Sequence, residues 1–257
     1  MKDSVVPATG GSGATGAPPA ISYVPWTRLW EGFEQHVADL ARQSGAVSLG
    51  ELGGGANPTL GLAEMVGRPL ELTVLDISPA ELERTPPQVQ TLCVDLCADE
   101  PPVRDRFDLV FSRMLCEHVR SGRTFHRNCL AALRPGGYAV HFFPSATALP
   151  FMLNRILPTA FSERLVEAFF PARRRGGKHA KFPARYSWCF GPTPVQVERF
   201  RSVGFEVVSS EVGIGHGYYD RIPPLRSLER AKSALVLRHP SPWLAAYVIV
   251  VLRRPTD

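Results

Sequence analysis

The stretch VSLGELGGGANP at residues 47–58 predicts a short buried strand, a glycine turn and the start of a helix. Glycine at Gly53 and Gly55 allows a tight turn and lets a ligand approach the backbone without an intervening side chain. Pro58 suits the first position of a helix, where its missing N–H is not needed. A helix that begins there directs unpaired N–H groups toward a ligand. Three glycines also suit an ordinary surface turn, so the functional interpretation needs a second residue.

Asp76 supplies that second residue. It ends the apolar run LELTVLD at residues 70–76, which predicts the next strand. A carboxylate about twenty residues after a glycine turn, at the end of the following strand, is the arrangement that binds the hydroxyls of a ribose. The two stretches together therefore indicate a site for a nucleoside-containing cofactor.

Five motifs stand in an order that resembles the class I S-adenosylmethionine-dependent methyltransferases, whose first motif is acidic-x-Gly-x-Gly. They are ELGGG at 51–55, the ribose-binding acid Asp76, the adenine-side acid Asp95, FDLVFS at 107–112 with EHV at 117–119, and LRPGG at 133–137. The resemblance covers residues 23–144 closely and residues 193–252 loosely. Asn57 departs from the pattern, because many members have a third glycine there.

The resemblance implies S-adenosylmethionine as the cofactor. Gly53 and Gly55 would approach its methionine part, and Asp76 would accept hydrogen bonds from both ribose hydroxyls. Asp95 would face the adenine amino group, although an acid after a strand is also a common helix cap. Glu51 would either anchor the loop or contact the amino group of the cofactor. The predicted cofactor-binding residues are Glu51, Gly53, Gly55, Asp76, Ile77, Asp95, Leu96 and Ser112.

The alternation of strand and helix patterns predicts an α/β fold with a parallel sheet covered on both faces. The resemblance implies a seven-stranded, doubly wound Rossmann-like sheet with a helical lid insertion, and a last strand antiparallel to the fifth. The expected strands are 47–52, 70–76, 90–94, 107–112, 138–143, 205–211 and 243–252. The expected helices include 23–44, 58–66, 124–133, 193–203 and 223–237.

Composition divides the chain further. Residues 1–21 are rich in Gly, Pro, Ala and Ser and predict a flexible tail. Residues 22–144 would form the cofactor-binding half, and residues 145–192 a substrate lid. Residues 193–257 would complete the same domain, with a second insertion at 213–240. Both insertions follow strands near the edge of the sheet where ligands bind.

Two histidines are candidates for a general base. His118 follows the fourth strand, where members of the resembling family often have a residue that lines the acceptor site. His216 lies among glycines and tyrosines in the second insertion, which suits either a pocket loop or an ordinary surface loop. His141 alternates with Val140 and Phe142 and is expected to pack within the sheet. Methyl transfer is a direct displacement that gains much from positioning, so a base is not always required.

The acceptor is expected to be a small molecule held by the lid. A basic run at 173–181 favours an anionic acceptor, although such a run is also typical of a solvated surface. The amphipathic stretch at 149–170 is compatible with a membrane surface and a lipid-linked acceptor. The predicted substrate-binding residues are Tyr23, Arg174, Arg175, Lys178, Tyr186, Trp188 and Tyr218.

Composition excludes several classes of protein. The chain has 257 residues, 44% hydrophobic content and a net charge of +5, which suit a globular protein with one sizeable core. No apolar run approaches the roughly 20 residues of a membrane helix, and the N-terminus lacks the apolar core of a secretory signal. The five cysteines show no paired metal spacing, so we predict free thiols, no metal and a cytoplasmic location.

The leading hypothesis is a small-molecule methyltransferase with an oxygen acceptor. A nicotinamide-dependent oxidoreductase is disfavoured because Pro58 occupies the third glycine position of its fingerprint. A non-catalytic cofactor-binding protein and an RNA methyltransferase are also compatible with these motifs. Nucleic acid is an unexpected partner, because the chain has no separate RNA-binding module. The identity of the acceptor and the oligomeric state stay open.

Overall fold

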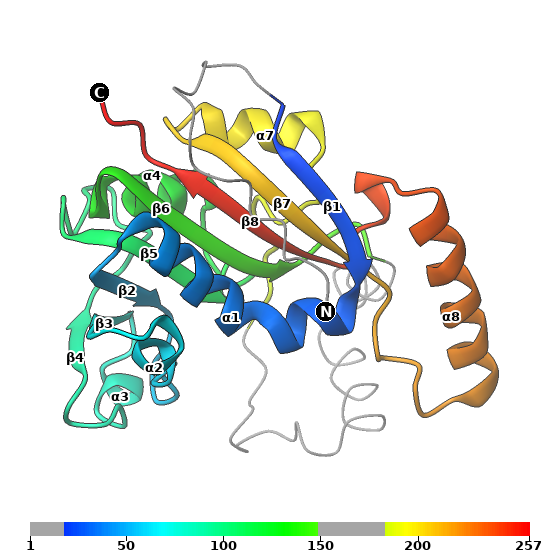
Figure 1. Cartoon of the computed structure of the whole chain (residues 1–257), viewed down its shortest axis with the longest axis horizontal. Helices are drawn as coiled ribbons and strands as arrows, with labels where there is room; N and C mark the ends of the chain where they lie inside the picture. Colours follow the sequence, from blue (N-terminus) through cyan, green and yellow to red (C-terminus); the bar gives the residue numbers. More distant parts are fainter. Residues whose placement is uncertain (1–17, 149–182) are drawn as a thin grey trace.

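The computed structural model describes residues 18–148 and 183–257, which form one eight-stranded sheet with helices on both faces (Figure 1). The strands are β1 (Ala20–Pro25), β2 (Ser48–Leu52), β3 (Glu71–Asp76), β4 (Gln90–Cys93), β5 (Phe107–Arg113), β6 (Leu133–Pro144), β7 (Glu206–Ile214) and β8 (Tyr247–Arg253). The helices are α1 (Trp26–Ser44), α2 (Leu62–Val66), α3 (Pro79–Leu82), α4 (Gly122–Ala132), α7 (Pro194–Arg201), α8 (Pro223–Arg238) and the short 3₁₀ helix η2 (Pro242–Leu244).

The sheet order is β1-β7-β8-β6-β5-β2-β3-β4. β8 is antiparallel to both neighbours, as expected for the last strand, and the other pairs are parallel. After β2 the chain adds β3 and β4 on one side and then returns to add β5 on the other. The order therefore reverses between β2 and β5, and ligands bind at such a switch point, outside the carboxyl ends of the strands.

Two neighbouring residues of β6 pack against helices on different faces of the sheet. Phe142 packs against Trp30 and Phe33 of α1. His141 packs against Phe125 and His126 of α4 instead. Because successive side chains of a strand point to opposite faces, α1 and α4 cover opposite faces of the sheet. His141 is fully buried, so its alternation with apolar neighbours reflects packing within the sheet, as expected.

Local signals explain several helix starts. The Ser78 hydroxyl accepts a hydrogen bond from the Glu81 backbone at 3.3 Å, and Pro79 follows as the first residue of α3. Thr193 and Pro194 repeat this arrangement at the start of α7. A capping side chain satisfies an N–H that has no partner inside the helix. These caps are local, because each depends on residues within one turn of the helix start.

The sheet has eight strands rather than the expected seven. The additional strand is β1, whose residues pair parallel with β7, and it includes Ala20 and Ile21 from the expected tail. The first helix consequently begins at Trp26 and not at Tyr23. Tyr23 and Trp26 have helical spacing, but Pro25 disfavours a helical conformation at the residue before it. Pro25 therefore ends the strand, and the helix follows directly.

Several other boundaries differ from expectation. Helix α2 begins at Leu62 and not at Pro58, so Pro58 does not open the helix after the glycine turn. Gly213 and Ile214 belong to β7 and not to the second insertion. Trp243 lies in η2, so β8 begins only at Tyr247. The turn at 133–137 lies within the bounds of β6, because Gly136 takes a φ of +80° without ending the strand.

The lid predicted at residues 145–192 is described only at its two ends, because residues 149–182 lie outside the described part of the chain. The Ala146 N–H donates to the Cys189 carbonyl at 2.7 Å, which joins the two ends to each other. In the described ranges, 18–148 and 183–257, no helix has the length and hydropathy needed to span a membrane.

Candidate active site

The glycine turn follows β2 at the switch point and requires glycine at two positions. Gly53 has a φ of +72°, and its N–H donates to the Leu75 carbonyl at 2.7 Å. A Cβ at Gly53 would lie 2.7 Å from Leu115. Gly55 has a φ of +46°, and a Cβ there would lie 3.2 Å from Asp76 Oδ2. The turn thus brings the backbone of Gly55 beside the acid that ends β3.

Glu51 is buried beneath this turn. Its Oε2 accepts from the Thr59 N–H and its Oε1 from the Thr59 hydroxyl, both at 2.8 Å. Burial raises the pKa of the Glu51 carboxyl, and the two bonds from Thr59 oppose that shift. Of the two roles open from the sequence, this geometry corresponds to an anchor for the loop. Thr59 was not singled out from the sequence, and the short separation between the two residues was the available signal.

Asp76 presents a carboxylate at the carboxyl end of β3. Its Oδ1 accepts from the Ser78 N–H at 2.9 Å, and its Oδ2 faces Gly55. Burial raises the pKa of Asp76, the Ser78 bond opposes this shift, and the nearby Glu81 charge adds to it. Ile77 beside it is 63% exposed. A carboxylate, a glycine backbone and an exposed apolar side chain fit a ligand with ribose hydroxyls and an apolar ring, so these residues fit the expected cofactor.

A second hydrogen bond stabilises the glycine turn. The buried Thr85 hydroxyl donates to the Gly55 carbonyl at 2.7 Å. Thr85 follows α3, so this bond ties the glycine turn to the segment after Asp76. The sequence did not indicate Thr85, because a lone threonine thirty residues from its partner carries no pattern.

Three further predicted cofactor residues have protein partners or are buried. Asp95 accepts from the Cys97 N–H at 2.7 Å and forms an ion pair with Arg120. Leu96 is buried in the core. The fully buried Ser112 hydroxyl shares a 2.8 Å hydrogen bond with His141 Nδ1. Asp95 can therefore contact a ligand only if its oxygens also stay paired with Arg120. The sequence did not indicate this ion pair.

His118 lies after β5, the strand next to β2. Its Nδ1 is 2.9 Å from the Pro183 carbonyl, and its Nε2 is 3.7 Å from Glu117 Oε1. Burial lowers the pKa of His118, and the Pro183 contact opposes that shift. The imidazole is about one-third exposed, whereas Glu117 is buried. His118 is thus oriented by a carbonyl yet accessible.

Glu117 has the most strongly shifted pKa among the carboxyl groups described at the carboxyl edge of the sheet. Burial raises its pKa to about 8, and its Oε2 has no hydrogen-bond partner among the described residues. Its backbone carbonyl accepts from the N–H groups of Arg185 at 2.6 Å and Tyr186 at 3.0 Å. A buried titratable group beside a histidine at a strand end is typical of functional sites. Glu117 lies within one of the five sequence motifs, but the sequence predicted no role for it.

His216 follows β7 at the same edge of the sheet and is more deeply buried. Its Nε2 lies 3.5 Å from Glu229 Oε1, and Tyr218 and Tyr219 pack against its ring. Burial lowers the pKa of His216, and the Glu229 charge opposes this. Glu229 itself pairs with Lys232 at 2.7 Å. The sequence did not indicate Glu229, which belongs to α8.

The predicted substrate residues are not brought together. Tyr186 is buried and hydrogen-bonded to the Glu117 carbonyl, and Trp188 stacks on His126 at a centroid distance of 5.8 Å. Tyr218 contacts His216, while Tyr23 lies in β1. The predicted residues Arg174, Arg175 and Lys178 lie outside the described residues.

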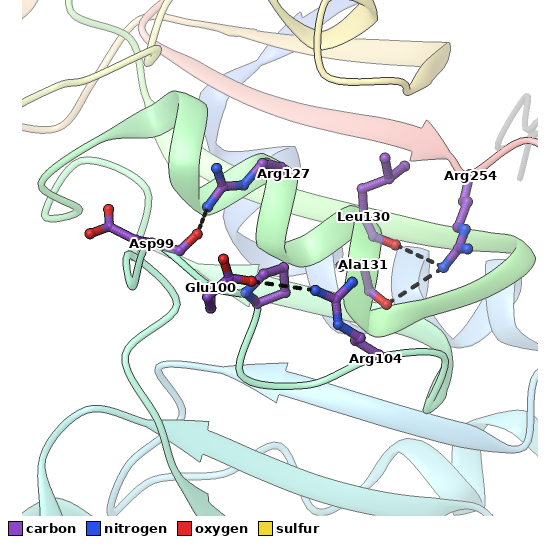
Figure 2. A pocket seen from close by; sticks show the side chains of 8 residues that line it. Asp99, Glu100, Arg104, Arg127, Leu130, Ala131 and Arg254 are labelled. Carbon is purple, nitrogen blue, oxygen red and sulfur yellow. Dashed lines mark hydrogen bonds and ion pairs between the residues drawn. The ribbon is translucent and has the colours of Figure 1, made fainter.

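A separate cavity of about 420 Å³ lies at the opposite edge of the sheet (Figure 2). Arg127 donates to the Asp99 carbonyl and Arg104 pairs with Glu100 at 3.7 Å, so these cations are already engaged. Arg254, which follows β8, donates to carbonyls of α4 (Figure 2). The cavity is distant from the glycine turn, and we assign it no part in the reaction. Within the described residues, no cluster of His, Cys, Asp and Glu could hold a metal ion.

Comparisons with known proteins identify the family and the fold. Residues 51–141 match the family described as "Methyltransferase domain", a range that begins at Glu51 and ends in β6. The crystal structure of the [4+2]-cyclase SpnF has a TM-score of 0.53 and 18% identity, over 94% of this chain and 90% of that chain. A proposed sarcosine dimethylglycine methyltransferase from Galdieria sulphuraria has a TM-score of 0.50 and 12% identity, over 87% and 86%. Among the curated proteins, none matches this chain.

Proposed function

We propose that this chain, a class I S-adenosylmethionine-dependent methyltransferase, methylates an oxygen nucleophile of a small organic acceptor, with His118 as the proton acceptor. The observation that carries the proposal is the placement of His118. It follows β5, next to the strand that leads into the glycine turn, and the Pro183 carbonyl orients its ring. The acceptor would therefore bind at the carboxyl ends of β5 and β6.

The cofactor would lie across the turn after β2. Bound there, S-adenosylmethionine supplies an electrophilic methyl group. Asp76 would accept hydrogen bonds from the ribose, since its Oδ2 faces the turn beside Gly55. Ile77 offers an exposed apolar surface for the adenine. Glu51 and Thr85 would act indirectly, because their bonds hold the shape of the turn.

The tautomer of His118 follows from its partner. A carbonyl oxygen only accepts hydrogen bonds, so Nδ1 carries the proton that is donated to Pro183. In the neutral ring the lone pair then lies on Nε2, and the lowered pKa keeps the ring neutral at neutral pH. A proton gained by Nε2 would lower the pKa of Glu117 3.7 Å away, because a nearby positive charge favours the carboxylate. Nε2 would take the proton that the acceptor hydroxyl loses, and an ionised Glu117 carboxylate would stabilise the resulting imidazolium.

The nature and location of the acceptor are further parts of the proposal. An anionic or lipid-linked acceptor is supported by the basic run at 173–181. If Arg174, Arg175 and Lys178 hold an anion, their triple replacement by Gln should raise the Michaelis constant of the acceptor and leave cofactor affinity unchanged. A cytoplasmic location is supported by the five cysteines, all of which are free.

A direct test is turnover with isotopically labelled S-adenosylmethionine and a panel of small alcohols, phenols, hydroxy acids and amines. The expected result is a labelled methyl ether or ester, with S-adenosylhomocysteine formed in equal amount. One similar structure is a [4+2]-cyclase, and a fold hosts different reactions, so formation of both products must be measured. Tight cofactor binding with methylation only of nitrogen acceptors would contradict the oxygen assignment.

A further inference from the structure

Helix α8 is apolar on the side that faces solvent. Leu228 and Leu235 are 67% and 59% exposed, and the small residue Ala231 between them is also exposed. Residues three and four apart in a helix lie on one face, so these three form a ridge along α8. Val236 is buried, which places the core side of the helix on a different face. We call Leu228, Ala231 and Leu235 the outer ridge.

Positive charge flanks the outer ridge. Lys232 and Arg238 are exposed and lie within one turn of the ridge residues, and Arg230 is exposed nearby. Glu229 is the acidic residue of this helix, and it is buried and paired with Lys232 and His216. The surface that α8 presents to solvent is therefore apolar and basic. A contiguous apolar patch exposed on a protein surface is typical of a contact with another molecule or with a membrane.

Two more large apolar side chains are exposed shortly after α8 in the chain. Figure 1 shows α8 at the outer edge of the molecule, beyond β1, where it runs along one side of the fold. Trp243 and Leu244 follow within the next turn of chain and are 56% and 53% exposed. Tryptophan favours the boundary between water and lipid, because its ring is apolar and its indole N–H is polar.

We propose that α8 docks on an anionic lipid surface, with the outer ridge in the acyl boundary and the flanking cations at the headgroups. An apolar ridge with Lys and Arg beside it is the composition of helices that lie in the membrane interface. A second copy of this chain fits less well. A symmetric pair would bring two α8 helices together, and their flanking cations would then face like charges.

Co-sedimentation with vesicles tests the proposal. The full chain is mixed with phosphatidylcholine vesicles that contain about 30 mol% phosphatidylserine, and separately with pure phosphatidylcholine vesicles. The test variant is Leu228→Gln with Leu235→Gln, because glutamine keeps helix propensity and removes the apolar ridge. The matched control is Val195→Gln, which changes a 58% exposed residue of α7. A second variant, Arg230→Gln with Arg238→Gln, removes two of the cations.

The expected result is binding to the anionic vesicles that weakens with added salt and is far weaker on neutral vesicles. The double leucine variant should lower the partition coefficient by at least about tenfold, while the Val195 variant binds like the parent. The arginine variant should bind less and with a shallower salt dependence. No binding to the anionic vesicles, or equal binding by the leucine variant, would overturn the proposal. A dimer that the leucine variant disrupts, without vesicle binding, would assign the ridge to a second copy instead.

Discussion

His118 and His216 occupy corresponding places in the fold and differ in almost every contact. Each follows a strand at the same edge of the sheet, and each lies near a glutamate, at 3.7 Å for His118 and 3.5 Å for His216. His118 is about one-third exposed and oriented by a carbonyl, whereas only 2% of the His216 side chain is exposed. Neither nitrogen of His216 has a hydrogen-bond partner among the described residues.

The glutamates beside the two histidines differ in their partners and in their ability to exchange a proton. Glu117 is buried with a pKa of about 8, and one of its oxygens has no partner in the described part of the chain, so it can exchange a proton near neutral pH. Glu229 is held by Lys232 and also accepts from the Ser233 hydroxyl at 3.3 Å. The first pair suits proton transfer, and the second suits attachment of the loop after β7 to α8. Proximity of a histidine to a carboxylate is therefore not sufficient to assign a general base. The exposure of the histidine and the other partners of the carboxylate determine whether the pair can transfer a proton.

The largest expected effect comes from His118→Asn. The asparagine amide can still donate to the Pro183 carbonyl, but it cannot accept a proton. We expect kcat to fall by about 10²–10⁴-fold, with cofactor affinity and thermal midpoint close to those of the parent. Steady-state kinetics with the identified acceptor measures this. Retained kcat in this variant would show that the Pro183 bond, and not proton transfer, is the role of the ring.

Asp76→Ala should lower the affinity for the cofactor, which the substitutions of the two histidines should leave unchanged. A hydrogen bond to a charged group contributes roughly 1.5–3 kcal/mol, so loss of one bond weakens binding by about tenfold to about 100-fold. Calorimetry with S-adenosylhomocysteine measures the change. Glu83→Ala is the matched control, since Glu83 is an exposed carboxylate a few residues away. Equal affinity in the two variants would contradict the assignment of Asp76.

Glu117→Gln should show how the first pair depends on pH. Burial raises the pKa of Glu117 from 4.5 to about 8. Below pH 4.5 the carboxyl is protonated in both folded and unfolded chains, so the variant gains nothing there. As pH rises toward 8, the unfolded chain ionises and the folded chain does not, which destabilises the parent by at most roughly 1.4 kcal/mol per pH unit.

The variant should therefore become more stable relative to the parent as pH increases from 5 to 8. Thermal midpoints of both proteins across that range measure the difference. His118 is present in both proteins, so its own titration largely cancels. A difference that stays constant over the range would mean that Glu117 is ionised in the fold.

The smallest effect is expected for His216→Phe. Phenylalanine keeps a ring against Tyr218 and Tyr219 and removes only the contact with Glu229. We expect kcat to stay within about threefold of the parent, because a positioned base contributes far more than that. If this variant loses as much activity as His118→Asn, the distinction between the two histidines is wrong.

Local patterns account for what the sequence predicted around the glycine turn. The turn itself, Asp76 and the start of α7 depend on residues a few positions apart, so their residue types carry the signal. The additional strand β1 was missed because an edge strand is specified by its neighbour, β7, nearly two hundred positions later in the chain. The short run before Pro25 had no pattern that distinguished it from the start of α1.

The sequence by itself determined the α/β alternation, the glycine turn and the acid that ends β3, because backbone conformation and strand periodicity are local properties. Only the tertiary structure decided which partners complete the site. His118 meets the carbonyl of Pro183, 65 positions away, and Asp95 meets Arg120 across 25 positions. Such contacts leave no periodic trace in the chain, because packing of distant segments creates them. For the same reason only the fold distinguished an accessible histidine after β5 from a buried one after β7.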